Sequence, residues 1–185
     1  MRLLALLLVA AFCAAPAAAQ ADTVKDFKRF FRKEKDAGVR VELVLSLVGV
    51  EDPGVAAVLL PILNDEDSAL AAAALRVVTG LQEPASRAPL LQVVLDGKPT
   101  PPLPVIARAA GEGHWPEFAA PLRTHVASKD DNMRLWTITA LGMLRDPEAM
   151  APAVLMAVQD VVPMVRVASI ETLIAIGRGR EAEAG

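Results

Sequence analysis

The sequence contains no tyrosine, and its aromatic residues are five Phe and two Trp among 185 residues. Ala, Leu and Val dominate instead, and hydrophobic residues make up 54% of the chain. An all-β domain draws on β-branched and aromatic residues, so this composition favours an all-α fold. The formal net charge of −3 gives no electrostatic reason to expect a nucleic-acid partner.

Residues that carry common chemistry are also scarce. Cys13 is the only cysteine, and His114 and His125 are the only histidines. The histidines lack the spacing of a zinc site, and glycine-rich phosphate loops and serine-nucleophile motifs are missing from the sequence. We therefore expect no metal, no cofactor and no catalytic residues.

The N-terminus has the anatomy of a secretory signal peptide. Met1 and Arg2 precede an apolar run from Leu3 to Ala15, and the small residues 17–19 follow Pro16. This pattern predicts a signal peptide over 1–19, cleaved after Ala19 or, as second choice, after Ala21, and export to the periplasm or beyond the cell. A transmembrane anchor is the alternative, but the run is shorter than the roughly 20 residues that a spanning helix needs.

Four glycines recur at one spacing: Gly49, Gly80, Gly111 and Gly142 are each 31 residues apart. Each follows an apolar helix-like run and precedes a proline. Glycine fits a left-handed helix end, and proline prevents the helix from continuing. We expect Gly142 to have a positive φ for this reason. A fifth run ends at Gly177, at a spacing of 35.

The repeat predicts a helical hairpin in each unit. The expected first helices are 39–50, 68–80, 103–111, 132–143 and 163–178, and the second helices are 54–63, 85–95, 116–127 and 147–158. Neither helix of a hairpin can bury its apolar face alone, so stacking of units into an α-solenoid is expected. The tail 179–185 is expected to be disordered.

The repeat unit resembles the HEAT repeat family, and within it the short HEAT-like units first grouped with phycobilisome lyases. The motif residues that carry the resemblance are Val39-Arg40, Gly49, Asp52-Pro53, Met133-Arg134, Ala140-Leu141-Gly142, Asp146-Pro147, Val165-Arg166 and Gly177. It covers 39–178 and implies a right-handed superhelix that binds a protein partner on the concave face of the second helices. Bilin chemistry does not suit an exported chain without a mature cysteine. Arg40, Arg134 and Arg166 hold matching positions and are expected to form a ladder of contacts with carboxylates between repeats.

The segment 22–36 precedes the first unit and carries six basic and four acidic residues. Val24, Phe27, Phe30 and Phe31 fall on one helical face. The segment is predicted to be an amphipathic helix that caps the open end of the solenoid. The alternative is a helix that lies on an anionic membrane surface and makes the protein peripheral.

The largest irregularity is the proline-rich segment 96–104. It is expected to widen the spacing between the second and third units and to shorten the first helix of the third unit. The turn after that helix is expected to be open, and His114, Trp115, Glu117 and Arg123 are the candidate partner-binding residues. The competing interpretation is that Trp115 packs as a core side chain over the shortened helix.

The sequence therefore predicts an exported, monomeric, non-enzymatic scaffold for protein–protein interaction. A second class stays open: an accessory or lyase-like enzyme subunit with a pocket near His114.

Overall fold

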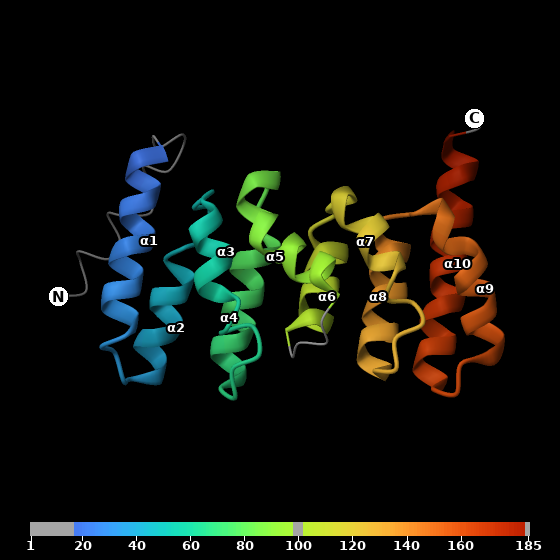
Figure 1. Ribbon diagram of the computed structural model, residues 1–185, viewed down its shortest axis with the longest axis horizontal. Helices are drawn as coiled ribbons and strands as arrows, with labels where there is room; N and C mark the ends of the chain where they lie inside the picture. The colour runs from blue at the N-terminus through green and yellow to red at the C-terminus, as the bar shows by residue number, and fades with distance from the viewer. Residues whose placement is uncertain (1–16, 98–101, 184–185) are drawn as a thin grey trace.

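The computed structural model describes residues 17–97 and 102–183, and over these residues the chain forms ten α-helices, two short 3-10 helices and no strand (Figure 1). The helices follow one another along the long axis of the molecule, so that the first and last helices lie at opposite ends. The all-α fold class is confirmed.

The helices form two rows. After α1 (Ala17–Phe31), the first row consists of α2 (Ala37–Leu45), α4 (Ser68–Thr79), α6 (Leu103–Glu112), α8 (Asp131–Met143) and α10 (Pro163–Glu183). The second row consists of α3 (Pro53–Leu59), α5 (Pro84–Asp96), α7 (Ala119–Arg123) and α9 (Met150–Gln159), with 3-10 helices η1 (Pro116–Phe118) and η2 (Pro147–Ala149) leading into α7 and α9. Helices pack against the helix two further along the chain, as α2 does on α4 and α6 on α8. This is the packing of stacked helical hairpins.

Aspartate residues begin several of the helices. The side chains of Asp36, Asp52, Asp67 and Asp130 accept hydrogen bonds from backbone N–H groups of α2, α3, α4 and α8. Each N-cap satisfies donors that have no partner inside the helix. These four aspartates therefore mark where α2, α3, α4 and α8 start.

Three helices end earlier than the sequence predicts, and one of them is α3, which is expected over 54–63 and ends at Leu59. The expected helix 39–50 ends at Leu45, and the expected helix 116–127 is α-helical only over Ala119–Arg123. In these last two, a hydroxyl just past the end bonds back to the helix: Ser46 Oγ donates to the Leu43 carbonyl at 2.6 Å and Thr124 Oγ1 to the Pro121 carbonyl at 2.7 Å. Such side chains offer the backbone an alternative to the helical ladder.

The C-terminal helix is longer than expected. The predicted disordered tail began at residue 179, whereas α10 is helical to Glu183. Most of the predicted signal peptide falls on residues 1–16, outside the described residues, and its last three residues open α1. No helix among the described residues is both long enough and apolar enough to span a bilayer.

The prediction that Gly142 ends its helix with a positive φ is wrong. Positive φ angles occur instead at Gly49, at Gly97 and, three residues past two of the repeat glycines, at His114 and Arg145, with φ of 53° and 52° for the last two. Gly111 and Gly142 lie inside α6 and α8, which run on past them. The helix end therefore falls on the residues after the glycine.

Gly111 and Gly142 instead allow close contact between helices. A Cβ at Gly111 would lie 2.8 Å from the Ala140 Cα, and one at Gly142 would lie 2.5 Å from Thr172 Oγ1. Real Cβ atoms do not come this close to other atoms, so only glycine lets α6 pack on α8, and α8 on α10, at this distance. By contrast, a Cβ at Gly177 would meet nothing within 4 Å.

We predict that Gly142→Ala lowers the free energy of unfolding by about 1–3 kcal/mol, because the added carbon overpacks the α8–α10 contact. It also disturbs the buried Thr172 hydroxyl, which donates to the Ile138 carbonyl at 2.8 Å. Gly177→Ala is the matched control in open space and should raise stability by about 0.5–1 kcal/mol. Urea unfolding of both variants checks this, and equal effects would contradict the assignment.

Candidate binding groove and central turn

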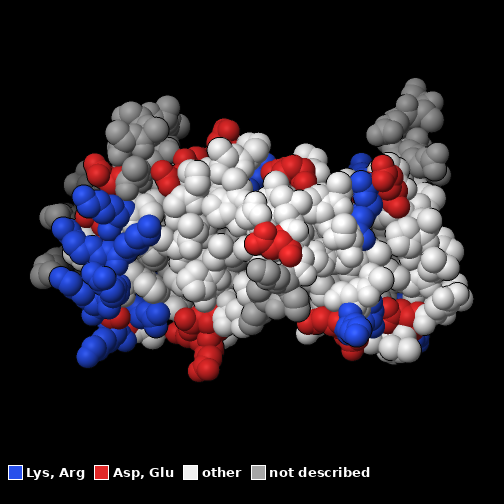
Figure 2. All heavy atoms as spheres, in the orientation of Figure 1, with Lys and Arg blue, Asp and Glu red and all other residues white. Residues whose placement is uncertain are grey.

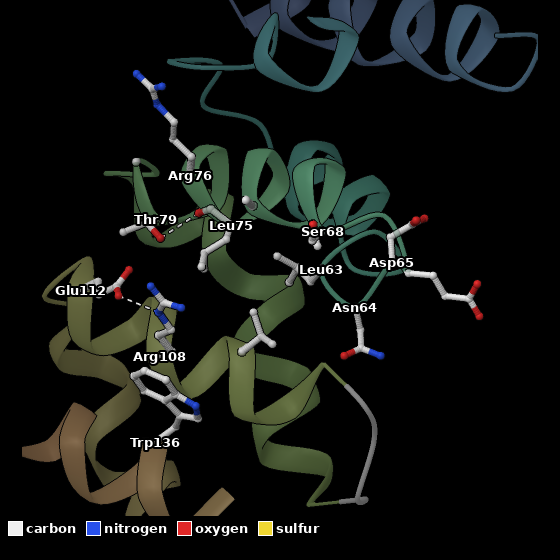
Figure 3. A pocket seen from close by; sticks show the side chains of 15 residues that line it. Leu63, Asn64, Asp65, Ser68, Leu75, Arg76, Thr79, Arg108, Glu112 and Trp136 are labelled. Carbon is white, nitrogen blue, oxygen red and sulfur yellow. Dashed lines mark hydrogen bonds and ion pairs between the residues drawn. The ribbon is translucent and has the colours of Figure 1, made fainter. Parts of the chain in front are cut away.

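An open groove of about 870 Å³ lies on the first row of helices, between α4 and α6 and reaching α8. Leu75 comes from α4, Arg108 from α6 and Trp136 from α8, and the three side chains meet across the groove (Figure 3). One end is polar, with Asn64, Asp65 and Glu66 from the turn before α4. The groove therefore combines an apolar floor with charged groups at its margins.

The groove follows from unequal packing of α6 against its two neighbours. Gly111 lets α6 approach α8 closely, whereas a Cβ at Gly80 would meet only carbonyls of its own helix. No equivalent close approach holds α4 against α6, and α6 begins only at Leu103, after the proline-rich segment. The groove lies between helices of the second and third units, where the prolines predict a wider spacing.

Two arginines line the groove, together with the carboxylates of Asp65, Glu66 and Glu112. Arg108 Nε donates to Glu112 Oε1 at 2.7 Å, and its guanidinium carbon lies 5.0 Å from the centre of the Trp136 ring. Arg76 is exposed and forms no ion pair with any residue that the structure describes. A stacked arginine and tryptophan form a preorganised surface for an incoming apolar or acidic side chain.

Trp115, one of the predicted partner-binding residues, is fully buried in the structure. Its ring lies 5.1 Å from the ring of Phe118, and its indole occupies the space beside Gly113, where a Cβ would lie 2.4 Å from Trp115 Nε1. This position agrees with the core interpretation of Trp115. His114 beside it is exposed and adopts the left-handed conformation, and it is not among the residues that line the groove.

Glu117 does not face solvent freely, because it pairs with the buried Arg87. Arg87 Nη2 lies 2.6 Å from Glu117 Oε1, and Arg87 Nη1 donates to the carbonyls of Leu81 and Gln82 at 3.1 and 2.9 Å. The same guanidinium lies 5.2 Å from the centre of the Trp115 ring. Arg87 thus joins the second unit to the third.

Arg123 is likewise used between units. Its Nη1 lies 3.0 Å from Asp146 Oδ1 and 2.8 Å from Glu148 Oε2. Asp146 is buried and also accepts from the Glu148 N–H. The central residues proposed from the sequence therefore contribute mainly to contacts that hold neighbouring units together.

The arginines at matching repeat positions have three different environments. Arg134 Nε and Nη2 donate to both carboxylate oxygens of Asp160, at 2.8 and 3.0 Å. Arg166 Nη1 donates to the Asp160 carbonyl at 2.9 Å, and the Arg40 guanidinium lies 4.6 Å from the centre of the Phe31 ring. The expected carboxylate ladder is therefore present at Arg134 but not in the contacts of the other two.

The Arg134–Asp160 pair is nearly inaccessible, with 12% and 6% of the two side chains exposed. The hydrogen bonds from Arg134 lower the pKa of the Asp160 carboxyl below its usual range, and the reciprocal bonds raise the pKa of Arg134. Both groups are therefore charged at neutral pH.

The N-terminal helix carries a cluster of cations. Lys and Arg gather over the α1 end of the molecule, whereas the opposite end is mostly uncharged on the face shown (Figure 2). On α1, Val24 and Phe27 are buried against the array and Phe30 is half exposed. The interpretations of this helix as a cap and as a membrane-surface helix both remain predictions.

Comparison with protein-family models finds none that matches the chain, and comparison with curated proteins finds no match. Among the residues that the structure describes, no group of three or more His, Cys, Asp and Glu side chains is placed to hold a metal ion. Arg108 and Trp136 are not among the residues that the sequence predicts for a site, and Trp136, which is partly buried, also packs against the hydrophobic core. The sequence pattern predicts no groove, although the proline-rich segment predicts a wider spacing between the two units whose helices line it.

We predict that Trp115→Ala lowers the free energy of unfolding by about 3–5 kcal/mol, because it empties a fully buried site beneath Arg87. His114→Gly is the adjacent control. It should leave stability unchanged or slightly higher, since glycine adopts positive φ without strain. Chemical denaturation measures both, and a Trp115→Ala protein as stable as the parent would contradict the core position.

We predict that Asp160→Asn destabilises the protein by about 1–3 kcal/mol at neutral pH, because a charge-assisted pair is lost. The lowered pKa of Asp160 adds stability above the unfolded carboxyl pKa of about 3.9, and this stability is lost as the pH falls through the folded value. The difference between parent and variant should therefore shrink below about pH 4. Arg134 Nη2 also lies 2.9 Å from the exposed Asp131 Oδ1, and Asp131→Asn, which removes this partner, should cost only about 0–1 kcal/mol. A difference that stays constant with pH in urea titrations would refute this account.

Proposed function

We propose that the protein is an exported, right-handed solenoid of HEAT-like repeats that binds another protein and has no catalytic activity of its own. Hydrogen bonds between units support the repeat. Glu51 accepts from the N–H groups of Gln82 and Glu83, Arg87 pairs with Glu117, and His125 Nε2 contacts the Val94 carbonyl, at separations of 30 to 32 residues. These separations match the 31-residue period.

The groove between α4 and α6 is the observation that carries the proposed activity. Ligand sites are concave and mostly apolar, with a few placed polar groups, and this groove has that composition. Leu75, Val105 and Trp136 supply apolar surface. Arg76 supplies a cation that has no ion pair among the described residues, whereas Arg108 is paired with Glu112. The partner that fits best is a peptide segment with an apolar anchor side chain and a neighbouring acidic residue.

The proposal places the first contact on α4, α6 and α8 rather than on the second helices or at the central turn. Trp115 would have to leave the core to touch a partner, and the charges of Glu117 and Arg123 are already paired. Arg76 is exposed and unpaired among the described residues, so it can form an ion pair with a partner's carboxylate without breaking an existing contact. The groove therefore offers binding at a lower structural cost.

We predict that Ala72→Glu abolishes partner capture while leaving the fold intact. Ala72 is an exposed residue of α4 that lines the groove, and glutamate is a good helix former that adds both bulk and a like charge for an acidic ligand. Ala88→Glu makes the same change at an exposed site on α5, outside the groove, and should leave capture unchanged.

The measurement is a pull-down from the exporting cell with three baits: the parent chain and the two variants. We expect the parent and the Ala88→Glu bait to retain one or more proteins that the Ala72→Glu bait does not retain. Retention of the same proteins by all three baits would place binding elsewhere, and no specific protein on the parent chain would contradict the scaffold proposal.

A further inference from the structure

The C-terminal end of the array exposes a set of large apolar side chains on α9, α10 and the turn between them. Their exposed fractions run from 48% to 84%. We call this surface the α9–α10 face, and it consists of Val154, Leu155, Val158, Val161, Met164, Val167, Ile170 and Ile174.

Helix α10 is apolar on two opposite sides. Val165, Ala168, Thr172 and Ile176 are buried, in line with the packing of α10 against α8 and α9. Val167, Ile170 and Ile174 recur at intervals of three and four residues and fall on the other side. The interior helix α8, by contrast, has neighbours on both sides, α6 and α10. The outer side of α10 is thus apolar and uncovered among the described residues.

Alignment of α10 with α8 shows that this outer side is not shaped for another identical unit. Arg134 Nη1 donates to the carbonyls of Ser128 and Lys129, and Arg166 Nη1 to those of Asp160 and Val161, so the two arginines are equivalent. In this alignment Ile174 takes the place of Gly142. The close approach that Gly142 permits is therefore blocked at Ile174, and whatever covers α10 must pack at a wider distance.

The charges on this side of α10 are arranged for symmetric pairing. Glu171 and Arg178 are both exposed, and they lie seven residues apart, on either side of Ile174. In an antiparallel pair of α10 helices related by a two-fold axis near Ile174, Glu171 of each copy lies opposite Arg178 of the other. A self-complementary patch of this kind is what a two-fold interface requires.

The size of the surface also fits association of two copies. Eight apolar residues exposed by about half or more carry on the order of 800 Å², which is what each partner buries in an interface of standard size. The cations over α1 lie at the other end of the molecule, so joining two C-terminal ends keeps the positive ends apart (Figures 1 and 2).

We propose that two copies of the chain associate through the α9–α10 face, with their α10 helices antiparallel about a two-fold axis near Ile174. This replaces the monomer expected from the sequence. The inference does not depend on the groove, which is lined by residues of α4, α6, α8 and the turn before α4.

Sedimentation velocity over a concentration series of the purified protein tests the association. The parent should form dimers, and Val167→Glu with Ile174→Glu should remain monomeric throughout, because two charges enter the centre of the interface. Both sites are exposed, so the far-UV circular dichroism of the variant should equal that of the parent. Val48→Glu, at an exposed valine outside the face, is the control and should leave dimers intact.

Charge exchange tests the antiparallel arrangement. Glu171→Arg should raise the dissociation constant about tenfold or more by placing like charges together, and Glu171→Arg with Arg178→Glu should restore the parent value. A parent protein that stays monomeric, or a Val167→Glu, Ile174→Glu protein that still dimerises, would overturn the proposal. Failure of the double exchange to restore dimers would overturn the antiparallel pairing.

Discussion

Burial of one-sided apolar helices between neighbouring units is the constraint on which the rest of this structure depends. The helices are short, and α8 shows how they are stabilised, since Ile138 and Leu141 are fully buried while the helix packs on both α6 and α10. Contact at this distance requires Gly111 and Gly142, because a Cβ at either position would collide with the next helix. Each unit is therefore stable only as part of the row.

Polar contacts then fix the register of the stack. The Glu51 carboxylate bonds to two N–H groups of the following unit, Arg87 joins two carbonyls to Glu117, and Arg134 pairs with Asp160. Apolar burial is not directional, whereas these bonds are satisfied in one arrangement only. This division of roles explains why charged residues of the central turn, which looked available for a partner, hold units together instead.

The two candidate interaction surfaces lie where no glycine brings a helix close to its neighbour. Between α4 and α6 no glycine contact draws the helices together, and a groove opens beside Trp136 and Arg108. On the outer side of α10, Ile174 replaces the glycine of the preceding unit, and apolar side chains remain exposed. Both surfaces include apolar side chains that stay at least partly exposed after stacking, and Leu75 and Trp136 of the groove also pack against the core.

The sequence alone determined the all-α class, the 31-residue spacing of the glycines and the location of the irregular junction, because these depend on local backbone preferences and on periodicity. Tertiary structure decided the rest. A repeated glycine predicts either a left-handed helix end or a close helix crossing, and only the position of the neighbouring helix assigned Gly111 and Gly142 to crossings and the positive φ to His114 and Arg145. In the same way, the sequence around Trp115, Glu117 and Arg123 does not determine whether these side chains are buried, paired or exposed. Burial and ion pairing depend on residues about 20 to 30 positions away in the chain, which meet only when the units stack.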